Sequence, residues 1–131
     1  MRLLLDTHIA LWGVTDYERL RSETRRRLED RQNEVFVSVE TLWEIAIKYA
    51  LPKGRADDMP ISAEEALAFF LEAGYRMLDI LPPHALAIAA LPPLHRDPFD
   101  RMLVAQARAE PLRLLTVDRK VAAYGDVAEL V

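Results

Sequence analysis

Residues 3–12 read LLLDTHIALW, and this stretch decides the fold. Leu3, Leu4 and Leu5 form a short apolar run without the alternation of a half-exposed strand, which is typical of a strand buried on both faces of a parallel sheet. The run ends abruptly at Asp6, and a short helix is predicted over residues 9–13. The stretch therefore predicts a central strand with a carboxylate directly at its end.

Strands and helices alternate along the rest of the chain. Further strands are predicted at residues 35–37, 77–81, 112–115 and 127–131. Helices are predicted at residues 41–51 after an N-cap at Ser38, at 62–73, at 82–91, at 98–110 after an N-cap at Asp97, and at 118–124, with a loop marked by Pro52, Gly54 and Asp57-Asp58. This order predicts one α/β domain over residues 1–131 with a mostly parallel central sheet.

The composition narrows the classes of function. The chain of 131 residues has no cysteine, which excludes disulfides, thiolate zinc sites and cysteine nucleophiles and suits a reducing cytosol. No apolar stretch approaches the roughly 20 residues of a membrane span, so we expect a cytoplasmic protein without membrane contact. The net charge of −4 is unusual for a nucleic-acid binder. Either the partner is not nucleic acid, or the acids serve metals while local basic patches hold phosphates.

Four carboxylates from distant positions are predicted to meet at one edge of the sheet. Asp6 and Asp118 follow strands, whereas Asp100 lies in the first turn of a predicted helix and Glu44 in the second turn of another. Ligands of open parallel sheets sit outside the carboxyl ends of the strands, where all four would converge. Together they would repel strongly unless a cation joined them, and hard oxygen ligands suit magnesium or manganese.

Each carboxylate also has a structural explanation when it is taken alone. Asp118 could cap its helix, and Asp100 could complete a capping box at the start of another. Glu44 shares an i, i+4 stripe with Glu40 and Lys48, the pattern of a solvated helix face with one ion pair. The single acids therefore leave both interpretations open, and only their combination favours a metal site.

Four segments carry a resemblance to a known family. They are LLLDTHIALW at 3–12, SVETLWEIAIKYALPKGR at 38–55, HRDPFDRMLVAQA at 95–107 and LLTVDRKVAAYG at 114–125. In this order and spacing they resemble PIN-domain ribonucleases, most closely the VapC-type toxins of bacterial toxin–antitoxin pairs. The likeness covers essentially the whole chain and implies a three-layer α/β/α domain.

The resemblance assigns roles to individual residues. Asp6, Glu44, Asp100 and Asp118 would be the catalytic residues that hold Mg²⁺ or Mn²⁺. Thr116 and Ser38 would orient these ligands, and Asp97 would be an N-cap that could touch a metal through water. The candidates for contact with RNA phosphates are Lys48, Lys53, Arg55, Arg96 and Arg101.

The same resemblance implies an activity and partners. One or two ions would polarise the scissile phosphate of structured RNA and activate a water for in-line attack, leaving 5′-phosphate products. A small antitoxin protein would dock its apolar segment near residues 40–73 and place a basic side chain by the acidic site. We also expect a homodimer or a higher toxin–antitoxin assembly.

Two rival functions remain at this point. A receiver-like signalling domain also has acids at strand ends, but it would need an acidic pair after the first strand, where this chain has the lone Asp6. A catalytically inactive PIN-like interaction module is the other rival, and the intact acidic set argues against it.

Overall fold

The computed structural model describes residues 1–55 and 58–131, so that Asp57 of the predicted loop lies outside the described residues. Five parallel strands form one sheet in the order β3-β2-β1-β4-β5. The strands are Arg2–Leu5 (β1), Glu34–Ser38 (β2), Arg76–Leu78 (β3), Arg113–Thr116 (β4) and Ala128–Leu130 (β5). The first strand is central, as its sequence predicts, and the described sheet is parallel throughout rather than mostly so.

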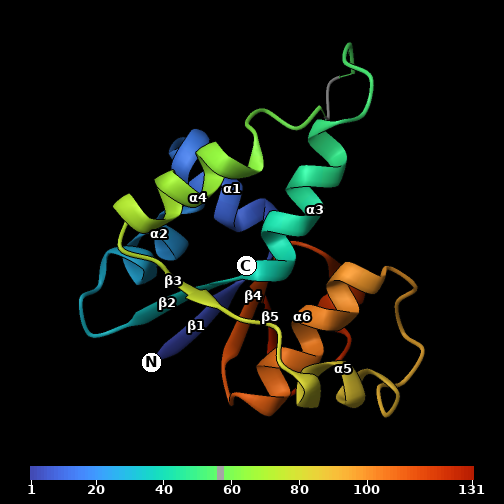
Figure 1. Cartoon of the computed structure of the whole chain (residues 1–131). Helices are drawn as coiled ribbons and strands as arrows, with labels where there is room; N and C mark the ends of the chain where they lie inside the picture. The colour runs from blue at the N-terminus through green and yellow to red at the C-terminus, as the bar shows by residue number, and fades with distance from the viewer. Residues whose placement is uncertain (56–57) are drawn as a thin grey trace.

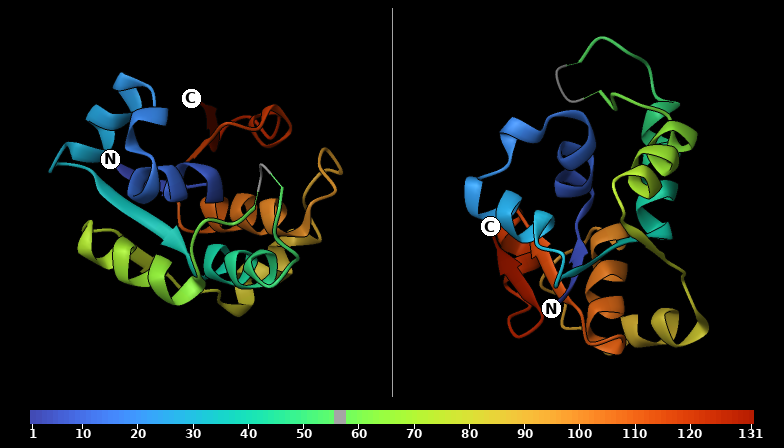
Figure 2. Two further views of the ribbon diagram at one scale, coloured as in Figure 1. Left: turned by 90° about the horizontal axis from the view of Figure 1, so that it is seen from above. Right: turned by 90° about the vertical axis from the view of Figure 1, so that its left-hand side faces the viewer.

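Helices cover both faces of this sheet (Figures 1 and 2). One side carries α1, α2 and α4, whereas α5, α6 and α7 lie on the other, and α3 rises from the end of β2. The helices are Thr7–Thr15 (α1), Ser22–Glu29 (α2), Val39–Tyr49 (α3), Ala63–Glu72 (α4), Pro82–Ile88 (α5), Pro98–Ala109 (α6) and Arg119–Ala122 (α7), with a 3₁₀ turn (η1) at Tyr17–Arg19. The predicted three-layer α/β/α architecture is therefore confirmed.

The position of β1 at the centre of the sheet explains why three consecutive residues, Leu3, Leu4 and Leu5, are apolar. Leu3 and Leu5 point into the core beneath α1 and α4, while Leu4 points into the second core beneath α6. All three are fully buried, because successive side chains of a strand face opposite sides of the sheet and both sides are covered here. In register, Leu4 pairs with Phe36 on β2 and with Leu114 on β4.

Most helix starts lie where the capping residues predict them. Ser38 caps α3, Asp97 caps α6 ahead of a proline, and Ser62 forms a capping box with Glu65 at α4. The prediction that the first helix begins at residue 9 was wrong: α1 begins at Thr7, because the Asp6 carboxylate caps it by accepting from the Ile9 N–H.

No helix among residues 1–55 and 58–131 is long and apolar enough to span a membrane.

Candidate functional site

The carboxyl ends of the three central strands bring the predicted acids to one edge of the sheet. Because β1, β2 and β4 are parallel neighbours, the residues that follow Leu5, Ser38 and Thr116 emerge side by side. Asp6 lies at this edge directly after β1, and α3 begins there directly after β2. Helix α6 packs against α3. The topology thus gathers side chains that lie far apart in the sequence.

Asp6 is held at the centre of this edge. It is 3 % exposed, and its Oδ2 atom accepts hydrogen bonds from the Thr116 hydroxyl at 2.7 Å and the Val117 N–H at 3.1 Å. Its Oδ1 atom accepts from the Ile9 N–H at 2.9 Å. Burial raises the pKa of Asp6 above its usual value, although these three hydrogen bonds oppose the rise. The carboxylate is therefore fixed in position by two strands and a helix.

Glu44 does not lie on the solvated face that its helical stripe suggests. It is only 5 % exposed, and the Thr7 hydroxyl donates to its Oε1 atom at 2.8 Å. Lys48 donates to Oε2 at 2.6 Å, so the ion pair expected from the sequence is present. Burial alone would lower the pKa of Lys48, but the hydrogen bond and charge of Glu44 raise it. This lysine partly neutralises the site and is not a free phosphate contact.

Asp100 and Asp118 meet across a histidine that the sequence argument passed over. The Nε2 atom of His95 lies 2.9 Å from Asp100 Oδ2 and 3.1 Å from Asp118 Oδ2. Since the Asp97 N–H donates to Nδ1 of the ring at 3.4 Å, Nε2 carries the proton and donates to the carboxylates. Burial, the charge of Asp97 and further acids raise the pKa of Asp100 to about 7, against the opposing effect of His95. The signal for this residue was its place in the HRDPFD segment.

Glu40 is a second site residue that sequence reasoning missed. Its side chain is fully buried, and neither carboxylate oxygen has a hydrogen-bond partner among the described residues. Burial and then the charges of Glu44, Asp100 and Asp97 raise the pKa of Glu40 to about 10. The i, i+4 spacing to Glu44 was the available signal, but it equally fits an exposed helix face.

The residues predicted to orient the ligands are placed differently from one another. Thr116 contacts Asp6 and also accepts from the Asp118 N–H at 3.0 Å, so that one hydroxyl links two acids. Ser38 instead donates to Gln106 at 2.6 Å, away from the carboxylates. Asp97 caps α6 through the Phe99 N–H at 2.8 Å, and its charge acts on Asp100 and Glu40.

The basic candidates also separate into two groups. Arg96 and Arg55 are exposed, and Lys53 lies over the Tyr49 ring with its Nζ donating to the Tyr49 carbonyl at 2.7 Å. Arg101, by contrast, is an internal tie: its guanidinium donates to the carbonyls of Ile88, Pro92 and His95 and to the Tyr124 hydroxyl, at 3.0–3.4 Å. Its geometry serves the loop that carries His95 rather than a phosphate.

We therefore expect Arg101→Lys to destabilise the protein by about 1–3 kcal/mol, because an ammonium cannot reproduce several forked hydrogen bonds. Arg96→Lys is the matched control and should change stability by less than about 0.5 kcal/mol, since Arg96 is exposed. Urea denaturation of both variants measures the difference. Equal unfolding midpoints would show that Arg101 does not anchor the loop.

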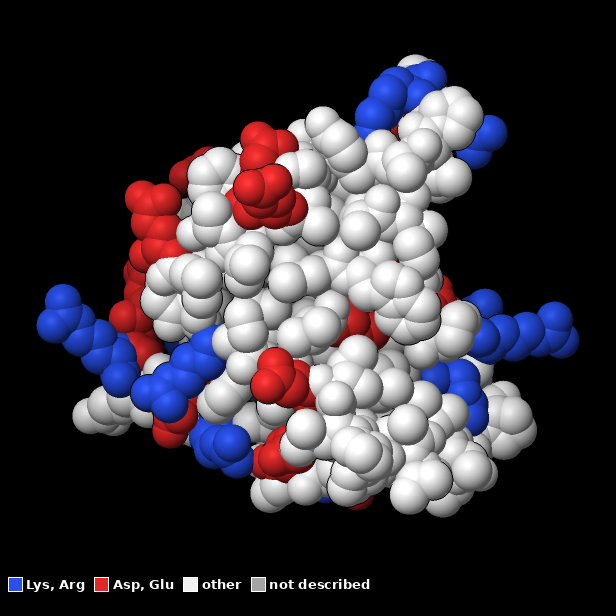
Figure 3. Space-filling model, viewed as in Figure 1, with Lys and Arg blue, Asp and Glu red and all other residues white. Residues whose placement is uncertain are grey.

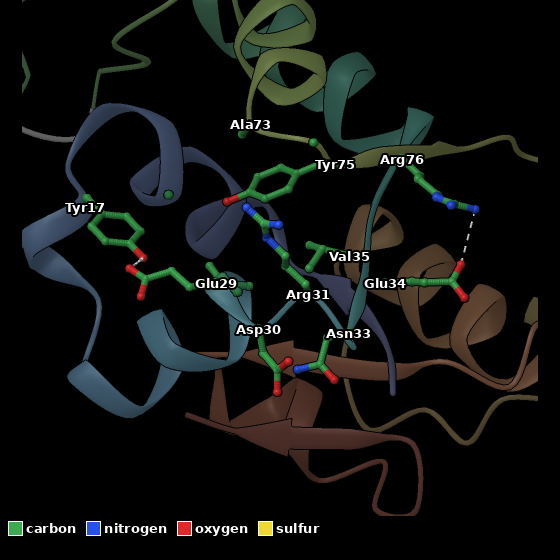
Figure 4. A pocket seen from close by; sticks show the side chains of 13 residues that line it. Tyr17, Glu29, Asp30, Arg31, Asn33, Glu34, Val35, Ala73, Tyr75 and Arg76 are labelled. Carbon is green, nitrogen blue, oxygen red and sulfur yellow. Dashed lines mark hydrogen bonds and ion pairs between the residues drawn. The ribbon is translucent and has the colours of Figure 1, made fainter.

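A cavity of the described residues lies away from this edge. Its volume is about 520 Å³, and it opens at the amino-terminal side of the sheet between α2 and β3 (Figure 4). Tyr17, Glu29, Arg31, Tyr75 and Arg76 are among its lining residues, and charges of both signs alternate around it. None of the site acids lines this cavity.

The donor set at the acidic edge fits a divalent cation. Ligand atoms of His95, Asp100 and Asp118 lie within 4.8 Å of one another. Glu44 and Asp6 stand close enough for their charges to raise the pKa of Asp100. Carboxylate oxygens in this number are the ligands of hard ions such as Mg²⁺ and Mn²⁺, and such an ion would remove the repulsion among them.

Comparisons with known proteins identify the family and the fold of this chain. The PIN domain family model matches residues 3–127. No curated protein matches the sequence. Among solved structures, VapBC2 from Rickettsia felis, bound to a DNA fragment from its promoter, has 17% identity and a TM-score of 0.71, with coverage of 99% of this chain and 98% of that one. DNA-bound VapBC from Salmonella typhimurium has 17% identity and a TM-score of 0.68, with 98% and 97% covered. FitAcB from Neisseria gonorrhoeae has 22% identity and a TM-score of 0.59, with 98% and 96% covered.

Proposed function

This chain belongs to the PIN domain family, whose model matches residues 3–127, and from that premise we propose that it is a Mg²⁺- or Mn²⁺-dependent endoribonuclease, the toxin of a toxin–antitoxin pair. One observation carries the proposal: carboxylates from β1, α3, α6 and the end of β4 converge at one sheet edge, where the pKa of Asp100 is raised to about 7. Membership of this family removes the receiver-like alternative. An inactive PIN-like module remains the alternative that the experiment below tests.

Asp6, Glu44, Asp100 and Asp118 would hold the ion, and the Nε2 atom of His95 lies beside two of them, Asp100 and Asp118. When bound, a divalent ion supplies Lewis acidity, which lowers the pKa of a water and offsets charge on the scissile phosphate.

The protein's own groups keep the ligands in place. Thr116 and the Val117 N–H fix Asp6, the Thr7 hydroxyl fixes Glu44, and the Nε2 proton of His95 holds Asp100 near Asp118. A water would attack the phosphorus in line and lose a proton, the bond from phosphorus to the 3′ oxygen would break, and that oxygen would take up a proton and leave as a 3′ hydroxyl. The products carry a 5′-phosphate.

Exposed basic side chains support a phosphate-binding role despite the net charge of −4. Arg96 directly precedes the acidic turn, and the loop after α3 carries Lys53 and Arg55, all exposed. We propose that these three contact the RNA backbone, while Lys48 and Arg101 remain engaged inside the protein.

Purified protein should cleave RNA when Mg²⁺ or Mn²⁺ is added and should stop when EDTA removes the metal. The physical reason is that four carboxylates alone provide no Lewis acid to offset the negative charge of the scissile phosphate. Gel analysis of a structured RNA, with end-labelling to detect 5′-phosphates, measures the reaction. Cleavage that persists unchanged in EDTA, with contaminating nuclease excluded, would contradict the metal dependence, and no cleavage with metal would favour the inactive module.

We further propose that a small antitoxin covers the apolar surface of α3 and α4. Trp43, Ile47 and Leu71 are 56%, 44% and 55% exposed, and Figure 3 shows a mostly uncharged area over α3, with acidic side chains over α4 beside it. Large exposed apolar residues gathered in this way mark interaction sites. The acidic edge beside α3 suits a basic side chain of the partner.

A second copy of the chain is proposed as a further partner. Leu86 on α5 is 76% exposed and supports this proposal. Sedimentation equilibrium measures the oligomeric state. The absence of cysteine supports a cytoplasmic location.

Expression of the chain should arrest growth, and co-expression of the small protein encoded beside its gene should reverse the arrest. Ile47→Asp should weaken that partner's binding at least about tenfold, or 1.4 kcal/mol, because a charge would be buried in the apolar contact. Leu130→Asp is the matched control, since Leu130 is 46% exposed but lies on β5. Calorimetric titration gives both affinities, and equal losses would contradict the proposed surface.

A further inference from the structure

Glu40 stands in a position that ordinary packing does not explain. It lies in the first turn of α3, its side chain is fully buried, and both carboxylate oxygens lack a hydrogen-bond partner among the described residues. Buried polar groups are nearly always hydrogen-bonded, and burial of an unpaired carboxyl costs several kcal/mol. A side chain of this kind calls for a partner that is not part of the protein chain.

The helix itself does not require a glutamate here. The start of α3 is capped by the Ser38 hydroxyl, which accepts from the backbone N–H of Glu40 at 3.0 Å. That bond uses the main chain only, so any residue at this position could make it. The carboxyl group is therefore surplus to the local structure.

The surroundings of Glu40 show where its carboxyl group lies. One helical turn later comes Glu44, and the side chains of residues at i and i+4 neighbour each other on a helix. After burial, the charges that raise its pKa are those of Glu44, Asp100 and Asp97. Lys48 donates to Glu44 and not to Glu40. Glu40 thus faces the acidic edge from the side where α3 meets α6.

We propose that Glu40 is a further metal ligand, so that the divalent ion is held by five carboxylates rather than four. This inference rests on the proposed function, because it assumes that the acidic edge binds a metal. Two buried acids one turn apart on α3 then act as a pair: Glu44 is oriented by Thr7 and Lys48, while the free oxygens of Glu40 complete the coordination from the α6 side.

Calorimetric titration of the metal-free protein with MnCl₂ tests the proposal without any assay of activity. Glu40→Gln should raise the Mn²⁺ dissociation constant at least about tenfold, the lower end of what loss of even a supporting group costs in metal affinity. Glu72→Gln removes the same charge from an exposed position on α4 and should bind Mn²⁺ as the parent does. A Glu40→Gln protein with the parent's affinity would overturn the assignment.

Crystals of the unaltered protein soaked in MnCl₂ give a second test that does not depend on the folding of a variant. Anomalous scattering should place Mn²⁺ with a Glu40 oxygen in its coordination sphere, at roughly the 2.0–2.2 Å of hard-ion ligands. An ion bound by the other acids with Glu40 turned away would overturn this inference alone. A parent protein that binds no Mn²⁺ would overturn the proposed function together with it.

Discussion

Asp100→Asn is expected to lower RNA cleavage by at least about a hundredfold while the protein stays folded. A metal-holding carboxylate contributes several kcal/mol of charge stabilisation in the transition state, and each 1.36 kcal/mol corresponds to a tenfold change in rate. The amide of asparagine keeps the shape of the side chain and can still accept from His95 Nε2, which now lies 2.9 Å from Asp100. Initial rates on one RNA at saturating Mn²⁺ measure the loss.

Asp16→Asn is the matched control for this change. Asp16 is exposed between α1 and η1, and its side chain does not cap the turn that follows. The Asp16→Asn variant loses the same negative charge at a position outside the site, so its rate of RNA cleavage should equal that of the parent. Full activity in Asp100→Asn, or an equal loss in both variants, would remove Asp100 from the catalytic set.

The second large effect is expected in the stability of the metal-free protein and its dependence on pH. Asp100 has a folded pKa of about 7 against an ordinary value of 3.8, so between these values the folded protein holds a proton that the unfolded chain has released. The contribution of Asp100 should therefore lower stability as the pH rises from about 4 to 7, and Glu40, whose pKa is raised to about 10, should extend the fall to higher pH. Asp100→Asn removes this penalty and should exceed the parent by about 1–3 kcal/mol at pH 8, but by little at pH 4.

Asp6→Asn should behave in the opposite way, although it removes the same charge from the same edge. An amide has one acceptor oxygen, whereas Asp6 accepts from Ile9, Thr116 and Val117. The lost cap costs about 0.5–2 kcal/mol, and a stranded buried donor adds about 1–3 kcal/mol. Urea denaturation in EDTA at several pH values should rank Asp100→Asn above the parent at pH 8 and Asp6→Asn below it.

Added metal then separates the role of Asp6 in the fold from its role in the site. Mn²⁺ at a hundredfold excess over its dissociation constant should stabilise the parent by about 2.7 kcal/mol. Both variants should lose most of that gain, because each lacks a charged ligand. An Asp6→Asn protein that is less stable yet keeps the full metal response would show that Asp6 is only a helix cap.

The order of strands and helices could be predicted from the sequence because apolar runs and capping residues are local signals. The uninterrupted Leu3–Leu5 run predicts a strand covered on both faces, and the capping residues Ser38, Ser62 and Asp97 predict where three helices begin. These patterns depend on backbone geometry within a few residues, so the order of strands and helices could be read without knowledge of distant contacts.

The environment of each acid depended on contacts that a linear pattern does not contain. An i, i+4 stripe of Glu40, Glu44 and Lys48 is the same whether its helix face meets water or α6, and packing decided that both glutamates are buried. His95 gained its place because Arg101 ties down the loop around it, and Ser38 turned to Gln106 across 68 positions of sequence. The sequence by itself predicted Asp6, Glu44, Asp100 and Asp118 at the sheet edge, but it indicated neither Glu40 nor His95 there. Only the tertiary structure decided how deeply each is buried and which partner it has, because burial and distance set the cost of a charge.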